Sequence, residues 1–190
     1  MRKVRNFNIN LRTKEILRSI KRLNAETEID AAVEIEVQRA CRYYLSFISP
    51  SVIYDVLKKD LSDFAYEKDA PAKWIARSVF FVSIGDQLQK EGEENPSLFS
   101  RCGENLLSTI AVDALDQSKS FVCRLIAKEA ELEDCSITRA IEIPAEFYPP
   151  IIEKIPIDKI EMAFENGVLF PKYSFCAMVY WMPNKKKSNK

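Results

Sequence analysis

Residues 138–181 read TRAIEIPAEFYPPIIEKIPIDKIEMAFENGVLFPKYSFCAMVYW and join turn signals to a long apolar run. An apolar segment that carries Arg139 leads into a loop broken by prolines, and the pair Asn166-Gly167 predicts a tight turn. Pro171 precedes the closing run 173–181, which we expect to be a strand. Its alternation places Tyr173, Phe175, Ala177 and Val179 on one face, and Ser174, Cys176, Met178 and Tyr180 on the other.

Upstream, apolar residues recur at helical spacing in the segments 12–23, 25–48 and 97–130. Asn24 or Thr27 could cap the second segment, Ser49-Pro50 ends it, and Cys102-Gly103 is expected to kink or divide the third. Shorter helical turns are predicted at 72–76 and 86–90, followed by a loop at 91–96. Apolar, β-branched and aromatic runs predict strands at 52–57, 61–66, 78–84, 136–143, 159–164 and 173–181.

The order of these segments predicts the fold class. Helices and strands do not alternate one for one, which indicates an α+β fold with a mostly antiparallel, twisted sheet flanked by helices. The run 78–84 is nearly continuously apolar and is therefore expected to be a central strand buried on both faces. We expect one globular domain over residues 1–184 and a disordered basic tail, KKKSNK, over 185–190.

Composition excludes several classes of function. The chain has 190 residues, 28 basic against 28 acidic, so no net charge attracts it to nucleic acid. It contains no histidine, which excludes Ser-His-Asp and Cys-His nucleophiles and removes the commonest metal ligand. Five cysteines without C-x-x-C spacing, no apolar leader at the N-terminus and no long apolar run predict a cytoplasmic protein with reduced thiols and no membrane span.

Several short segments, in order, resemble the activation (reactivation) domain of cobalamin-dependent methionine synthase. The matches are the segment 9–23, the Pro-x-x-x-Tyr pattern at Pro50 and Tyr54, Ser83-Ile84-Gly85 after an apolar strand, Asp116 closing a long helix, the loop from Arg139, and the Pro-x-x-Ser pattern of Pro171 and Ser174. In that family an Arg-x-x-x-Gly-Tyr loop binds S-adenosylmethionine. The resemblance implies that this ligand contacts Arg139, Ile141, Asp116 and Tyr180.

The resemblance also implies a function. The chain is expected to be a stand-alone reactivation component that presents S-adenosylmethionine for reductive remethylation of oxidised cobalamin. Cobalamin would come from the partner, a cobalamin-dependent methionine synthase or other corrinoid protein without its own activation domain. A flavodoxin-type or other donor would supply the electron. On this interpretation the chain is an accessory part of a methyltransferase and is not active alone.

Other interpretations remain open at this point. Ile143-Pro144 stands where the family has Gly-Tyr, which favours an activation-domain fold that acts as a non-catalytic binding module for a corrinoid protein. A small-ligand-binding α+β protein unrelated to cobalamin is a third possibility. Three of the four site residues also have a plain structural alternative: Arg139 as an ordinary edge arginine, Asp116 paired with Lys119 three residues on, and Tyr180 as core.

Overall fold

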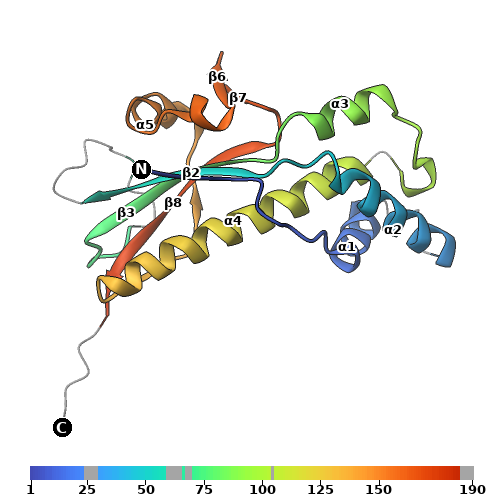
Figure 1. The fold of residues 1–190 in the computed structure, drawn as a ribbon. Helices are drawn as coiled ribbons and strands as arrows, with labels where there is room; N and C mark the ends of the chain where they lie inside the picture. Colours follow the sequence, from blue (N-terminus) through green and yellow to red (C-terminus); the bar gives the residue numbers. More distant parts are fainter. Residues whose placement is uncertain (24–29, 59–65, 67–69, 104, 185–190) are drawn as a thin grey trace, which may run out of the picture.

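An antiparallel sheet organises the fold (Figure 1). The computed structural model describes residues 1–23, 30–58, 66, 70–103 and 105–184. The sheet order is β1 (Arg2–Arg5), β2 (Ser51–Lys58), β3 (Ala76–Ser83), β8 (Ser174–Pro183) and β4 (Cys135–Ile137), and β5 (Ile141–Glu142) also pairs with β8. Every pairing is antiparallel. The predicted α+β class is confirmed, as are the strands expected at 52–57, 78–84 and 173–181.

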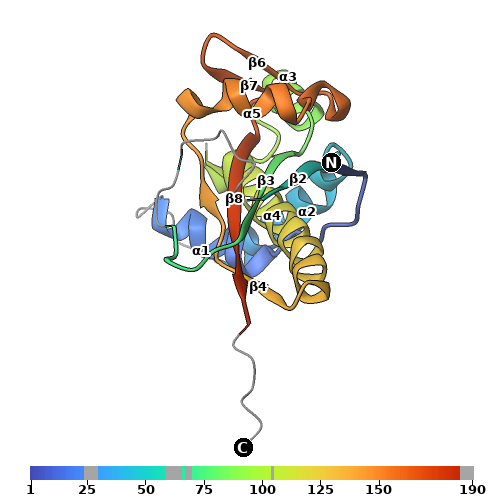
Figure 2. The same ribbon diagram turned by 90° about the vertical axis from the view of Figure 1, so that its left-hand side faces the viewer.

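The two faces of the sheet are covered by different elements (Figure 2). The long helix α4 (Leu106–Leu132) packs Val122, Ile126 and Ala130 against one face, which includes Ala177, Val179 and Trp181 of β8. The opposite face, with Cys176, Met178 and Tyr180, is covered by α5 (Tyr148–Lys154), the 3-10 turns η3 (Ala145–Phe147) and η4 (Ile157–Ile160), and the hairpin of β6 (Ala163–Glu165) and β7 (Val168–Phe170). The predicted alternation along β8 is therefore confirmed.

A helical cluster lies beyond one end of the sheet (Figure 1). It joins α1 (Thr13–Leu23), α2 (Ala31–Leu45), α3 (Gln87–Glu94), the turn η2 (Ser100–Cys102) and the first half of α4 around a shared apolar core. Asp30 caps α2, because its carboxylate accepts a hydrogen bond from the Val33 backbone N–H at 2.8 Å. The predicted caps Asn24 and Thr27 lie outside the described residues. The predicted division near Cys102-Gly103 is confirmed, since η2 ends at Cys102 and α4 begins at Leu106.

Tertiary contacts override two local predictions. The short helix predicted at 72–76 is wrong, because a turn occupies this segment and Ala76 already begins β3. Ile75 donates its N–H to the Trp181 carbonyl at 3.1 Å, which draws the segment onto the sheet. The strand predicted at 136–143 is divided into β4 and β5. The Thr138 hydroxyl accepts the Tyr180 N–H at 3.0 Å in place of a main-chain partner, so the ladder is interrupted there.

Three further boundaries differ from the sequence patterns. The strand predicted at 159–164 begins later than expected: Lys159 and Ile160 belong to the turn η4, Glu161, with φ of 59°, ends that turn, and β6 starts at Ala163. The loop predicted at 91–96 is helical as far as Glu94. The patterns predict neither β1 nor α5, whose first turn holds Pro149 and Pro150, where a missing N–H costs no helical hydrogen bond. The predicted strand segment 61–65 and the tail 185–190 lie outside the described residues.

All five cysteines are free thiols, and four of them are buried. Burial raises the pKa of Cys102 from 9.0 to about 11, and it raises the pKa of the Tyr54 phenol from 10.0 to about 12. None of the helices in the described residues is both long and apolar enough to cross a lipid bilayer.

The raised thiol pKa makes a prediction about stability at alkaline pH. The unfolded chain releases the Cys102 proton near pH 9, whereas the folded chain holds it until about pH 11. The stabilisation is therefore complete below pH 9 and is lost as the pH rises through 11. We expect the fall in free energy of unfolding between pH 9 and 11 to be shallower in Cys102→Ala, measured by urea denaturation. If the free energy of unfolding fell equally steeply with pH in Cys102→Ala and in the unaltered chain, the raised pKa of Cys102 would be contradicted.

Two glycines at the same φ of 82°, Gly85 and Gly167, allow a matched test of turn geometry. A Cβ at Gly85 would lie 3.3 Å from the Ser49 Cβ, whereas a Cβ at Gly167 would meet nothing within 4 Å. Gly167→Ala should cost about 1 kcal/mol of stability from backbone strain alone. Gly85→Ala should lower the stability further, because the backbone strain is joined by crowding of the new Cβ against the Ser49 side chain. Equal losses in thermal unfolding would show that the Ser49 contact relaxes without cost.

Candidate functional site

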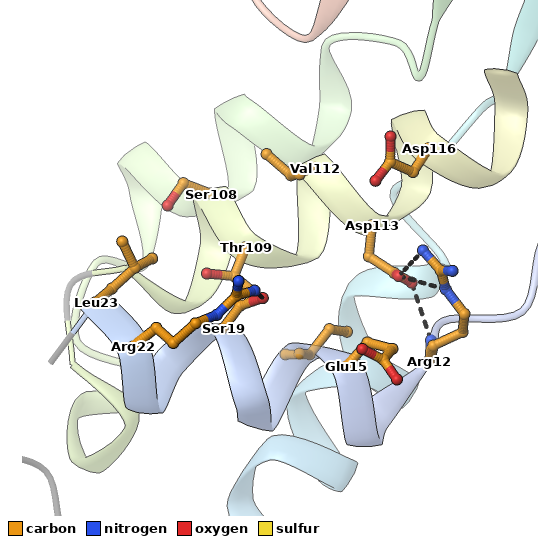
Figure 3. A pocket seen from close by; sticks show the side chains of 11 residues that line it. Arg12, Glu15, Ser19, Arg22, Leu23, Ser108, Thr109, Val112, Asp113 and Asp116 are labelled. Atoms are coloured by element: carbon orange, nitrogen blue, oxygen red, sulfur yellow. Dashed lines mark hydrogen bonds and ion pairs between the residues drawn. The ribbon is translucent and has the colours of Figure 1, made fainter. Parts of the chain in front are cut away.

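A hollow of about 570 Å³ lies between α1 and α4 (Figure 3). Helical spacing explains its lining, because residues three and four apart lie on one face of a helix. The first helix and the residue before it contribute Arg12, Glu15, Ser19 and Arg22, and α4 contributes Ser108, Thr109, Val112, Asp113 and Asp116. Ile16 and Leu23 of α1 complete the lining, so the hollow combines charged and apolar side chains. Asp116, one of the predicted ligand contacts, lies on its wall.

Asp113 is the buried charge of this hollow, with a side chain only 5% exposed. Its Oδ2 accepts the Arg12 backbone N–H at 2.9 Å and the Gln117 amide at 2.8 Å, and its Oδ1 accepts the Arg12 Nε–H at 2.7 Å. These bonds, drawn in part in Figure 3, fix the start of α1 on α4. Asp113 is thus fully engaged within the chain, and its role is to join the two helices.

The sequence analysis did not single out the Arg12–Asp113 pair, although a signal exists. Asp113 is a charged residue next to Ala114 and three after Ile110, on the apolar stripe of α4. A charge in such a stripe requires a partner when it is buried. The partner is one hundred residues away in sequence and becomes apparent only when α1 and α4 are packed together.

Asp116 lies one helical turn further along α4, at the rim of the hollow. Its side chain is 48% exposed, and it forms an ion pair with Lys119 at 2.8 Å. The structural alternative stated for this residue, a pair with Lys119, is therefore present. Exposure leaves part of the carboxylate open to a cationic ligand approaching the rim.

Arg139, Ile141 and Tyr180 come together elsewhere, where β4 and β5 meet the outer side of β8. Thr138 donates its N–H to the Tyr180 carbonyl at 2.9 Å, and Ile141 is the cross-strand partner of Met178. The Arg139 side chain is exposed at this edge, and no hydrogen bond or ion pair joins it to the described residues. The guanidinium is thus free to bind a carboxylate from solution.

Tyr180 is fully buried on the sheet face that α5 covers, with its ring 5.2 Å from that of Trp74. Asp116 belongs to α4, which covers the other face. The sheet therefore separates Tyr180 from Asp116, and neither Arg139, Ile141 nor Tyr180 lines the hollow between α1 and α4. Of the four predicted ligand contacts, Arg139, Ile141 and Tyr180 are therefore neighbours, and Asp116 lies apart from them. The assignment of these residues to a ligand stays a prediction.

Ile143 occupies the position of the family's glycine, and the structure shows what it does there. Its side chain is buried in the core under α5, and its N–H donates to the Cys176 carbonyl at 3.0 Å. Pro144, with φ of −63° and ψ of 149°, then precedes η3. The backbone at Ile143 thus continues the pairing with β8, and its N–H is not available to a ligand.

No cluster of three or more Cys, Asp or Glu side chains with the geometry of a metal site occurs within the described part of the chain. Each of the three acidic residues of the hollow has a basic partner: Asp113 pairs with Arg12, Asp116 with Lys119 and Glu15 with Arg18.

The overall fold is similar to one known from a crystal structure. No protein-family model matches the chain, and none of the curated proteins matches it either. Among solved structures, it is similar to the MetH reactivation domain bound to AdoHcy, with a TM-score of 0.48 and 10% identity. The superposition covers 83% of this chain and 69% of that one. A likeness of this degree assigns no residue a role.

Asp113 and Asp116 of α4 allow a matched test, because one is buried and the other exposed. Asp113→Ala removes a buried carboxylate and strands the N–H groups of Arg12, so we expect a loss of about 2–3 kcal/mol in the free energy of unfolding. Asp116→Ala removes an exposed pair and should cost less than about 0.5 kcal/mol. Chemical denaturation of both variants tests this. A comparable loss in the two would mean that Asp113 is not the anchor of α1.

Proposed function

We propose that this chain is a stand-alone reactivation component for cobalamin-dependent methionine synthase, one that presents S-adenosylmethionine for reductive remethylation of the partner's oxidised cobalamin. The ordered series of sequence matches motivates the proposal. The structural observation that supports it best is the position of Arg139, exposed and without a partner among the described residues at the edge of the sheet. In the resemblance, this arginine belongs to the loop that binds the ligand.

The geometry at this edge suits an extended ligand with an amino-acid end. A guanidinium holds a carboxylate through two parallel N–H bonds, and β4 and β5 form the last strands of the sheet, so their outer backbone groups face away from β8. Arg139 would orient the carboxylate, and Ile141, half-buried beside it, would pack against the ligand. The sulfonium of S-adenosylmethionine supplies an activated methyl group, so no proton transfer by the chain is needed.

The residues fit this ligand in part. Arg139 and Ile141 lie at one edge, whereas the buried ring of Tyr180 would act through the position of Thr138 and not by touching the ligand. Asp116 lies across the sheet from Tyr180, on the helix that covers the other face. Cobalamin would come from the corrinoid partner, and the electron from a flavodoxin-type or other donor.

A specific observation favours a second candidate, a non-catalytic binding module for a corrinoid protein. Ile143 fills the core and commits its N–H to Cys176, at the position where close backbone approach to a ligand would need a glycine. Pro144 adds no donor. A chain that has kept the fold and lost the ligand loop would show both features.

Titration calorimetry with S-adenosylmethionine separates the two candidates. We expect saturable one-to-one binding, and Arg139→Ala should weaken it by about 1.5–3 kcal/mol because a charge-assisted bond is lost. Arg124→Ala removes an equally exposed arginine from α4 and serves as the control, with no expected effect.

An affinity that Arg139→Ala leaves unchanged would contradict the residue assignment. Absence of binding, both alone and with a corrinoid methionine synthase present, would contradict the reactivation role. If the chain nevertheless co-purified with that synthase, this result would support the binding module.

A further inference from the structure

A row of four polar side chains crosses one end of the sheet. The cross-strand partners are Arg5 with Ser51, Ser51 with Ser83, and Ser83 with Ser174, so one register line passes through β1, β2, β3 and β8. Directly paired residues project to the same face of an antiparallel sheet. Three hydroxyls and one guanidinium therefore lie side by side.

The row faces the side of the sheet that α5 and the β6–β7 hairpin cover. Ile53 and Phe81 lie two residues from Ser51 and Ser83 and pack into the core on that side, and side chains two apart share a face. A separate hollow of about 390 Å³ opens there, lined by Ser49, Ser51 and Ser83 together with Gly85, Gln87 and Pro171. It lies at the end of the sheet where β3 leads into α3.

The O–H groups of the three serines in this row have no acceptor among the described residues. Ser51 is only 8% exposed, and no hydrogen bond of its side chain joins it to the described residues. Ser83 accepts the Gly85 N–H at 3.1 Å, which leaves its own O–H free to donate into the hollow. The buried Ser174 Oγ likewise has no hydrogen-bond partner in the described residues. Buried hydroxyls without partners are rare, because each costs free energy. By contrast, the buried Ser78 hydroxyl accepts the Trp181 indole N–H at 2.8 Å.

The start of α3 adds further donors to the same hollow. Asp86, the residue before this helix, makes no side-chain capping bond, and both Asp86 and Gln87 line the wall. The first N–H groups of a helix have no intrahelical acceptor, and they carry the positive end of the helix dipole. They therefore favour a negatively charged oxygen at this position.

The two carboxylates near the hollow are each neutralised by a base. Asp86 pairs with Lys90 at 2.5 Å, and Glu161 pairs with Arg5 at 2.7 Å. The remaining lining includes three serine hydroxyls and two side-chain amides, together with apolar residues: Ser49, Ser51, Ser83, Asn6, Gln87, Gly85, Ile160 and Pro171. The charge that the hollow presents to a ligand is therefore set by its hydrogen-bond donors and by the first turn of α3, and not by the two paired carboxylates.

We propose that this hollow binds a phosphate group, as free phosphate or as a phosphomonoester. Ser51 and Ser83 would donate from the strands, and the backbone at the start of α3 would donate from the opposite wall. The tetrahedral group would accept from the two hydroxyls of the row that line the hollow, those of Ser51 and Ser83.

The test is a titration of the isotope-labelled protein with inorganic phosphate in NMR, at constant ionic strength held with chloride. We expect saturable shifts of the Gly85, Gln87 and Leu88 amides. Ser51→Ala should weaken the affinity about tenfold, because it removes one bond to a charged group, without lowering the melting temperature. Gln87→Glu should abolish binding by repulsion, although an acid at this position favours the helix. Ser136→Ala, at an exposed serine of β4, is the control and should change nothing.

A parallel titration with phenyl phosphate distinguishes the two sources of the group. Tighter binding of the ester would assign the hollow to a phosphomonoester, and tighter binding of inorganic phosphate would assign it to the free ion. Shifts that do not saturate, or an affinity that both Ser51→Ala and Gln87→Glu leave unchanged, would overturn the proposal. Neither result depends on whether S-adenosylmethionine binds at Arg139.

Discussion

The burial of β8 on both faces is the constraint on which the rest of the structure depends. Five consecutive residues of this strand, Cys176 to Tyr180, are fully buried, and their side chains alternate between two separate cores. One face requires α4 as a cover, and the other requires α5 and the β6–β7 hairpin. Both edges of β8 are also paired, with β3 on one side and β4 and β5 on the other. The strand at the end of the chain is thus the centre of the fold.

This central position has consequences for the edge where Arg139 lies. The main chain from β4 to β5 must follow β8, yet the Thr138 hydroxyl replaces one main-chain partner and interrupts the ladder. Arg139 follows this interruption, and its side chain faces solvent. Ile143 then returns to the core and to regular pairing with β8. A short irregular stretch between two anchored residues is a suitable place for a binding group, because it is exposed while both of its ends are held.

The polar groups of the interior divide into two classes. Asp113 and Ser78 are matched within the chain, by Arg12 and by Trp181, and they join elements that are distant in sequence. Ser51 and Ser174 are not matched among the described residues. The unmatched hydroxyl of Ser51 therefore keeps a donor for a ligand in the hollow that this residue lines. The first class contributes to stability, and Ser51 of the second class is one of the groups on which the proposed phosphate site rests.

The sequence by itself determined the fold class, the three long helices and the central strands. Their signals are local: helical spacing in α1, α2 and α4, the nearly continuous apolar run of β3, and the alternation of β8. The Asn166-Gly167 turn was equally predictable, because its positive φ angles suit those residue types. Only the tertiary structure decided that Arg12 meets Asp113, that Tyr180 lies across the sheet from Asp116, and that Ser51, Ser83 and Ser174 form one row. Each of these depends on strand register or helix packing between residues far apart in the chain, and local periodicity carries no information about such distances.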